Sequence, residues 1–170
     1  LERWGLEIAG IGIVTPETAY STGPKTVAPF EFRDPAAVVK ELLPVARSQG
    51  ADVVVVLSHL ASDMNQQTGE VTGDAAELAR NTPGLDAVVS GHSHQTVAGK
   101  AAGVPVVQAY YNGRALGRIS LVYSRRDRKI IASSVQALET PVKEAKADDG
   151  IAAIVNRAQS EIAPVKNVAL

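Results

Sequence analysis

Two stretches of the sequence decide the fold: Asp52-Val-Val-Val-Val-Leu-Ser-His59 and Leu85-Asp-Ala-Val-Val-Ser-Gly-His-Ser-His94. In each, a run of apolar, mainly β-branched residues indicates a strand that is buried on both faces of a sheet. Each run passes into serine and histidine residues, so potential ligands follow directly where the predicted strand ends.

Helix and strand patterns alternate around these two segments. Asp34-Pro35 is a good helix start, since aspartate can cap the first turn and proline fits its first position. Apolar residues then recur at helical spacing until Gly50, and Pro44 is expected to kink this helix. The other predicted elements are strands over Leu6–Val14, Val104–Gln108, Leu116–Tyr123 and Lys129–Leu138, helices over Asp74–Arg80 and Asp148–Ala163, and loops over Pro16–Phe32 and Ala61–Gly73. This succession predicts an α/β fold in which helices flank a mixed β-sheet.

Composition narrows the class of protein. The chain has 170 residues, of which 45% are hydrophobic and 21% charged, as expected for one globular domain. Its net charge of −1 lacks the basic excess of a nucleic-acid-binding domain, so we expect no nucleic-acid polymer as a partner. No apolar run reaches the roughly 18–20 residues of a membrane helix. Without cysteine, disulfides, thiolate zinc sites and cysteine nucleophiles are excluded.

The chain's three histidines, His59, His92 and His94, all follow predicted buried strands. Ligands of open α/β sheets bind at this edge, where loops converge over the strand ends. Gly91 is expected to let the chain turn sharply, so that His92 and His94 can point into one cavity. Imidazole is a common ligand of zinc, manganese and related ions. The spacing favours a metal site but does not decide between an open three-histidine site and a share in a two-metal centre.

Several segments resemble a known family. The resemblance begins near Gly5, and its specific parts are Ser58-His59 and Gly91-His-Ser-His94. The segments that carry it are Phe32–Pro35, Gly50–Leu60, Pro83–His94, Val104–Gln108 and Leu116–Leu121. They are similar to the second half of the catalytic domain of bacterial 5′-nucleotidases and 2′,3′-cyclic-nucleotide phosphodiesterases, which are calcineurin-like metallophosphoesterases.

The resemblance implies a hydrolase of phosphate esters, a nucleotidase or cyclic-nucleotide phosphodiesterase that uses hydroxide activated by two divalent metal ions. It implies that His59 and His92 bind one metal and His94 the other, and it leaves open whether the ions are Zn, Mn, Mg or Co. The family's Asp-x-His, Gly-Asp and Gly-Asn-His/Asp-Glu motifs precede the matched region. The one Gly-Asp here, Gly73-Asp74, is interpreted as a helix start with Asp74 as its N-cap. The chain is therefore expected to supply only part of the site and to be inactive alone.

The resemblance also predicts an organisation. Residues 1–147 are expected to be the C-terminal half of a catalytic domain, part of a calcineurin-like sandwich, and residues 148–170 a helix leading toward a further C-terminal domain. The expected partners are a nucleotide or other phosphate-ester substrate and the N-terminal half of the domain. Since the family is commonly exported, a periplasmic or secreted location is expected.

Two rival hypotheses remain at this stage: a non-catalytic remnant, and a self-contained three-histidine metal-binding module. Asn112 and Arg114 are weak candidates for substrate contacts, because Asn112-Gly113 is also a strong turn signal. Asp63 and Asn65 either support the site or are solvated loop residues. The cluster Arg125, Arg126, Arg128 and Lys129 is interpreted as a charged hairpin tip.

Overall fold

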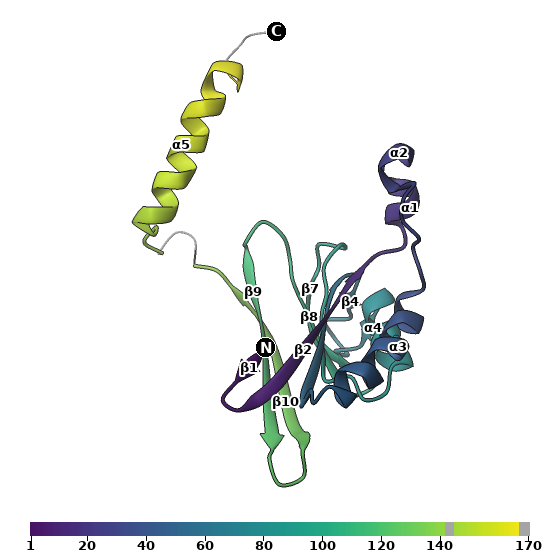
Figure 1. The fold of residues 1–170 in the computed structure, drawn as a ribbon. Coiled ribbons are helices and arrows are strands. Elements are labelled where there is room, and N and C mark those ends of the chain that lie inside the picture. Colours follow the sequence, from purple (N-terminus) through teal and green to yellow (C-terminus); the bar gives the residue numbers. More distant parts are fainter. Residues whose placement is uncertain (142–144, 167–170) are drawn as a thin grey trace. The chain divides into compact units, whose positions relative to one another are not determined.

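The computed structural model describes residues 1–141 and 145–166 of the chain. A six-stranded sheet with the order β1-β2-β3-β6-β8-β7 forms its centre (Figure 1). The four strands β2, β3, β6 and β8 run parallel, and β1 and β7 pair antiparallel at the two edges. The strand bounds are Glu2–Arg3 (β1), Leu6–Val14 (β2), Val53–His59 (β3), Ala87–Val89 (β6), Thr96–Ala101 (β7) and Val104–Ala109 (β8). The predicted mixed sheet of an α/β fold is confirmed.

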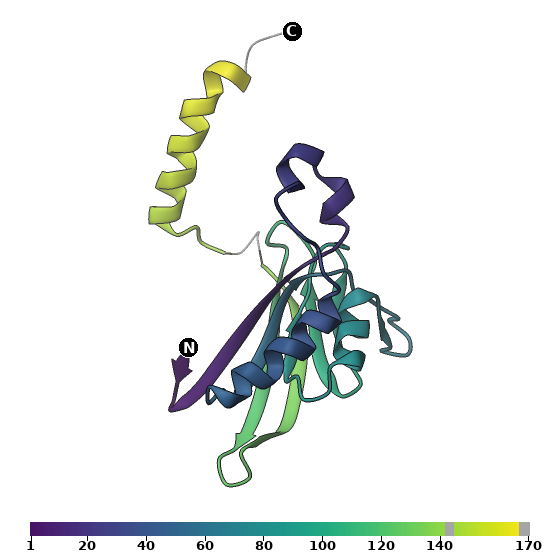
Figure 2. The same cartoon turned by 45° about the vertical axis from the view of Figure 1, so that its right-hand side comes forward.

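The sheet lies between a helical layer and a hairpin layer. Helices α3 (Pro35–Ser48) and α4 (Asp74–Asn81) pack on one face, and the hairpin of β9 (Ala115–Ser124) and β10 (Lys129–Glu139) packs on the other, against β7 and β8 (Figures 1 and 2). Gly117 of β9 permits the close approach of this hairpin, because a Cβ there would lie 2.9 Å from Val107 Cγ2. The predicted hairpin is confirmed.

The core lies between the sheet and the two helices. Val54, Val56 and Val88 from the central strands are completely buried, as is Val39 from α3. Leu57 departs from the predicted burial of its strand on both faces, since 55% of it is exposed. Apolar burial therefore supports the central part of β3 but does not extend to Leu57, two residues before His59.

The predicted start and end of α3 are confirmed. The Asp34 carboxylate accepts a hydrogen bond of 2.7 Å from the backbone N–H of Ala37, and Pro35 is the first helical residue. The helix runs to Ser48 with Pro44 inside it, and Gly50 follows with a φ of 97°.

The cap of α4 differs from the prediction. Gly73, with a φ of 89°, occupies the N-cap, and Asp74 is the first residue of the helix. A Cβ on Gly73 would lie 2.9 Å from the carbonyl oxygen of Ala61. The close approach of the neighbouring backbone selects glycine here, so the interpretation of Asp74 as the N-cap was wrong.

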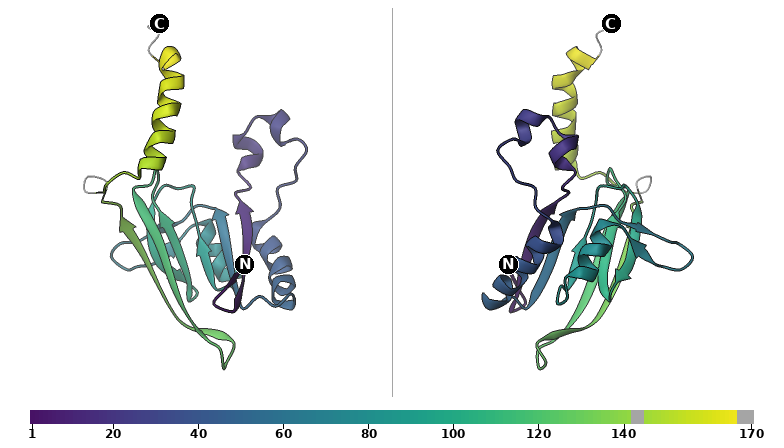
Figure 3. Two further views of the ribbon diagram at one scale, coloured as in Figure 1. Left: turned by 60° about the vertical axis from the view of Figure 1, so that its left-hand side comes forward. Right: turned by 90° about the vertical axis from the view of Figure 1, so that its right-hand side faces the viewer.

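Several short elements lie within predicted loops or were not predicted. The segment after β2 contains α1 (Thr18–Ser21) and α2 (Pro24–Val27), which project beyond the C-terminal end of β2 (Figure 3). The 61–73 segment contains the small antiparallel pair β4 (Asp63–Met64) and β5 (Val71–Thr72). Strand β7 escaped prediction because it is short and rich in small and polar residues. Its Gly99 faces Val71 so closely that a Cβ would lie 2.4 Å from Val71 Cγ2.

The described residues from Pro141 to Lys166 form a second compact unit, distinct from residues 1–140. It contains α5 (Asp149–Lys166), which starts where the Asp148 carboxylate accepts a 3.0 Å hydrogen bond from the N–H of Ile151. The predicted end at Pro164 was wrong, because a proline in the last turn removes only one hydrogen bond near a terminus. The last four residues of the predicted 148–170 segment lie outside the described residues. No helix among residues 1–141 and 145–166 has the length and apolar character to span a bilayer.

Candidate functional site

Two of the three predicted ligands meet at the C-terminal edge of the central sheet. His59 is the last residue of β3, and His92 lies in the loop that follows the neighbouring parallel strand β6. The Nε2 atom of His59 lies 3.3 Å from Nδ1 of His92, and the two rings meet edge-on with their centroids 5.0 Å apart. Parallel pairing of the strands explains this meeting, because it places the ends of both strands at the same edge.

The third histidine faces a different neighbour. The ring of His94 lies 4.9 Å from that of Tyr111, measured between centroids. Within the part of the chain that the structure describes, no three or more His, Asp or Glu side chains gather as a metal-binding group. The binding of metal by His59, His92 and His94 therefore stays a prediction, with only the first two now in contact.

The loops of the site hold unusual backbone conformations. His92, His94, Tyr110 and Asn112 have φ values of 70°, 53°, 58° and 54°, in the left-handed region that non-glycine residues seldom adopt. Each such residue costs on the order of 1 kcal/mol and persists only where its surroundings enforce it. The strain lies in the loop after β6 and the loop after β8, which are neighbouring strands.

A buried hydrogen-bond network holds the loop after β6 in its strained conformation. The Nε2 of Gln108, a residue that is 1% exposed, donates to Ser93 Oγ at 2.9 Å and to the carbonyl oxygen of Gln95 at 3.0 Å. Ser93 Oγ in turn donates to the carbonyl oxygen of Ser62 at 2.6 Å. The network fixes the loop that carries His92 and His94. Sequence reasoning missed it, because serine and glutamine carry no pattern that predicts a buried partner.

Gly91 has a role that the sequence did not predict, beside the ring of His59. Its φ is not positive, so it makes no left-handed turn, but a Cβ on it would lie 3.4 Å from Nδ1 of His59. Glycine therefore leaves room for the His59 ring, and the sharp turn expected at Gly91 stays a prediction.

Glu17 is a site residue that sequence reasoning missed. Its Oε2 lies 2.8 Å from Nε2 of His92, the ring nitrogen on the side away from His59. Glu17 follows β2, whose last residue, Val14, pairs in register with His59. The available signal was its place just after a buried parallel strand, at the same sheet edge as the histidines.

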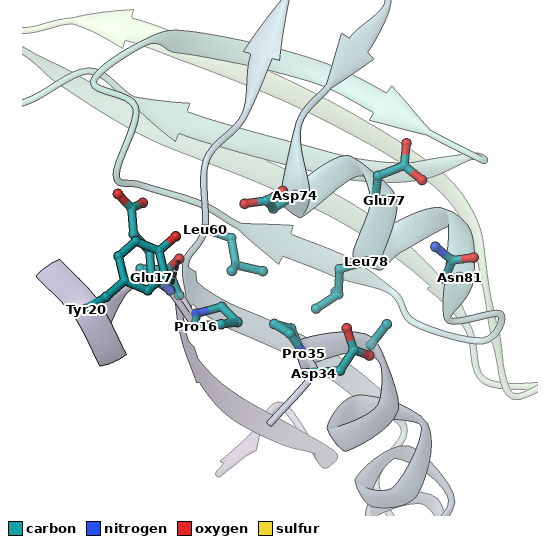
Figure 4. Close-up of a pocket in the computed structure, with 12 residues that line it drawn as sticks. Pro16, Glu17, Tyr20, Asp34, Pro35, Leu60, Asp74, Glu77, Leu78 and Asn81 are labelled. Carbon is teal, nitrogen blue, oxygen red and sulfur yellow. Dashed lines mark hydrogen bonds between the residues drawn. The ribbon is translucent and has the colours of Figure 1, made fainter. Parts of the chain in front are cut away.

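A pocket of about 340 Å³ adjoins the site and shares Glu17 with it. Figure 4 shows the side chains of Leu60 and Leu78 among carboxylates from three separate segments. The acidic lining residues are Glu17, Asp34, Asp74 and Glu77. This charge disfavours a phosphate ester, so the pocket itself is a poor place for an anionic substrate.

The loop after β8 combines a turn with an aromatic stack. The N–H of Arg114 donates to the carbonyl oxygen of Tyr111 at 3.2 Å, which confirms a turn at Asn112-Gly113. The Arg114 guanidinium lies 5.0 Å from the Tyr111 ring centroid and 5.7 Å from that of Tyr110. A hydrogen bond with Tyr111 raises the pKa of Tyr110 above its usual value. The stack places a cation near His94, and substrate contact by Asn112 or Arg114 stays a prediction.

Asp63 and Asn65 serve their own loop. Asp63 accepts from the N–H of Met64, and Asn65 accepts from the N–H groups of Gln67 and Thr68. These local bonds support the solvated-loop alternative.

The basic hairpin cluster does more than keep a tip soluble. Arg125 donates to the carbonyl oxygen of Trp4, and Arg128 lies 3.5 Å from Asp52. Both arginines thus fasten the β9–β10 hairpin to the segments around β1 and β3, which the hairpin-tip interpretation did not include.

Comparison with known proteins finds sequence similarity to nucleotide-hydrolysing enzymes. The chain is 26% identical over 162 residues to endonuclease YhcR of Bacillus subtilis, a match covering 95% of this chain and 13% of that protein. It is 26% identical over 154 residues to a 5′-nucleotidase of Vibrio cholerae, covering 77% of this chain and 28% of the other. This chain is a homologue of the 5′-nucleotidases and related phosphoesterases.

The fold agrees with this homology. The crystal structure of calcineurin-like phosphoesterase YfkN from Bacillus subtilis matches 92% of this chain and 52% of its own, with 21% identity and a TM-score of 0.76. No family model matches this chain. The chain spans less than a third of the length of the first curated relatives it matches. Calcineurin-like phosphoesterases and 5′-nucleotidases generally depend on divalent metal ions.

Proposed function

We propose that the full-length protein hydrolyses phosphate esters of nucleotides or cyclic nucleotides with two divalent metal ions, and that this chain supplies part of the site. The observation that carries the proposal is the 3.3 Å separation between His59 Nε2 and His92 Nδ1. Two nitrogens that each lie about 2.0–2.1 Å from one tetrahedral ion are roughly 3.3 Å apart, so the pair fits a shared cation. We assign His59 and His92 to one metal and His94 to the other.

The chain's residues contribute the positions of the histidine side chains. When bound, the divalent ions supply charge that stabilises phosphoryl oxygens and lowers the pKa of water. The Gln108–Ser93 network holds the loop of His92 and His94 in its strained conformation. The space left by Gly91 lets the His59 ring lie against the neighbouring loop. Remaining ligands come from residues outside this chain in the proposal.

Substrate contact is assigned to the loop after β8. Arg114 is held over Tyr110 and Tyr111, so its guanidinium is oriented rather than freely rotating, and guanidinium forms paired hydrogen bonds with phosphate oxygens. Asn112, exposed in the adjacent turn, offers a second hydrogen-bond donor through its side-chain amide. These two residues would bind the ester near His94, which stacks on Tyr111.

The organisation and location are part of the same proposal. Residues 1–147 belong to the catalytic domain, and residues 148–170 lead toward a further domain. We place the protein in the periplasm or outside the cell. A match to a protein named cell wall protein Lmo0130 of Listeria monocytogenes supports an exported location.

The test is turnover by the full-length protein loaded in turn with Zn²⁺, Mn²⁺, Mg²⁺ and Co²⁺. AMP, 2′,3′-cyclic AMP and single-stranded DNA are compared as substrates, and phosphate release and strand cleavage are measured. We expect hydrolysis of a nucleotide or cyclic nucleotide, lost in His92→Ala and retained in Glu41→Ala, which removes the exposed ion pair between Glu41 of α3 and Arg33. Metal binding without turnover of any substrate would favour a non-catalytic metal module. The absence of both metal binding and turnover would favour a remnant.

A further inference from the structure

We propose that Glu17 is a positioning residue for His92, holding the ring so that Nδ1 faces His59 and can bind the cation. This inference rests on the proposed function, since the cation is the one assigned there to His59 and His92. It adds a residue that neither the histidine motifs nor the turn signals of the sequence single out.

The hydrogen-bonding capacity of the two groups carries the inference. An ionised carboxylate only accepts hydrogen bonds, whereas a neutral imidazole has one N–H and one lone pair. With Glu17 Oε2 at 2.8 Å, the proton of neutral His92 belongs on Nε2. The lone pair is then on Nδ1, the atom that lies 3.3 Å from His59 Nε2. A carboxylate bound to the outer nitrogen of a metal-binding histidine is a common way to fix its tautomer and orientation.

The fold places the carboxylate for this role. Glu17 N–H donates to Oγ1 of Thr15 at 3.3 Å, and Thr15 is only 5% exposed. The Glu17 carbonyl oxygen accepts from the N–H of Ser21 at 2.9 Å, which opens α1. The backbone of Glu17 is therefore held from both sides, directly beyond the strand end that pairs with His59.

The exposure of Glu17 and His92 argues against a role of their contact mainly in stabilising the fold. The side chains of Glu17 and His92 are 43% and 32% exposed, and a hydrogen bond between groups this exposed contributes little to folding stability. The effect of removing Glu17 should consequently appear at the cation and not in the unfolding transition.

The experiment uses the full-length protein and the variants Glu17→Ala and Glu17→Gln. Zn²⁺ affinity is measured by competition with a chromophoric chelator, and the ring nitrogens of His92 are followed by ¹⁵N NMR in the metal-free protein. We expect Glu17→Ala to weaken binding of one Zn²⁺ by about 10–100-fold, with changed His92 ring shifts and an unchanged Tm. Glu17→Gln should be intermediate, because its amide oxygen still accepts from Nε2–H but carries no charge. Glu41→Ala, which removes a carboxylate bound to Arg33, is the matched control and should keep the wild-type affinity.

Two outcomes separate this inference from the proposed function. If His92→Ala loses one Zn²⁺ while Glu17→Ala binds as the wild type with unchanged His92 shifts, the role of Glu17 is overturned and the metal site stands. If His92→Ala keeps full Zn²⁺ affinity, the metal assignment fails and this inference fails with it. Should Glu17→Ala not fold, the affinity and shifts of the Gln variant decide in the same way.

Discussion

Both ends of strand β3 carry polar side chains, and the two ends differ in how these side chains are paired. At its N-terminal end, the Asp52 carboxylate accepts from the Tyr123 hydroxyl at 2.7 Å and from the N–H of Glu7 at 3.1 Å. Nearby, Asp86 accepts from Arg47 at 2.6 Å and from the N–H of Val54 at 2.7 Å. These carboxylates are only 15% and 13% exposed, and they join the hairpin, α3 and the central strands.

At the C-terminal end, the pairing is sparser and the backbone is strained. His59 and His94 are exposed, and His92 lies between His59 and Glu17 with a φ of 70°. A cluster that saturates its hydrogen bonds stabilises the fold, whereas one that keeps ring nitrogens within reach of a ligand can bind one. The comparison favours the C-terminal end of β3 as the candidate site, because its side chains are more exposed and its backbone is strained.

The largest expected effect is that of His92→Ala on activity. Loss of one cation removes several kcal/mol of transition-state stabilisation, so kcat of the full-length protein should fall on the order of 10³-fold. The unfolding midpoint should stay close to the wild-type value, because His92 is exposed to about a third. Steady-state kinetics and thermal unfolding measured together check this. Near-normal kcat in the variant would contradict the assignment of the C-terminal end as the site.

Asp86→Ala should give the opposite pattern at the N-terminal end. It leaves the N–H of Val54 and the guanidinium of Arg47 without their shared acceptor, which should lower the free energy of unfolding by about 2–3 kcal/mol. Once folded, the variant should keep the wild-type kcat, and urea unfolding with activity assays measures both. A large loss of kcat in fully folded protein would erase the distinction between the two ends.

Asp52 should make stability depend on pH. The hydrogen bond from Tyr123, followed by that from the backbone of Glu7, holds the pKa of Asp52 below its ordinary value. Because the folded-state pKa is the lower one, its stabilising contribution is present above about pH 4 and is lost as the pH falls through the folded value. Tyr123→Phe should therefore reduce the fall in Tm between pH 7 and pH 3. An unchanged acid dependence would show that Asp52 is not held by this bond.

The smallest expected effect belongs to Gly91→Ala. Its new Cβ would lie 3.4 Å from Nδ1 of His59, close enough to displace the ring by a few tenths of an ångström. We expect Zn²⁺ affinity to fall severalfold with little change in Tm, whereas Gly12→Ala, at a position with nothing within 4 Å of the added Cβ, should leave affinity unchanged. Chelator competition distinguishes the two variants. Equal affinities would mean that Gly91 is not needed for the placement of His59.

The sequence by itself determined the elements whose signals are local. Runs of β-branched residues located β3 and β6, the Asp34-Pro35 pair located the start of α3, and the order of strands and helices indicated the α/β fold. It also placed His59 and His92 after neighbouring strands, because parallel pairing turns that sequence position into one edge of a sheet. These inferences needed only residues that are neighbours along the chain.

Only the tertiary structure decided the contacts between distant residues. Glu17 meets His92 across 75 positions, and Gln108 reaches the carbonyl oxygen of Ser62 across 46. Gly73 replaced Asp74 as a cap because the backbone at Ala61 lies against it. None of these contacts leaves a periodic trace in composition, because a hydrogen bond or a close approach depends on where two segments meet in space.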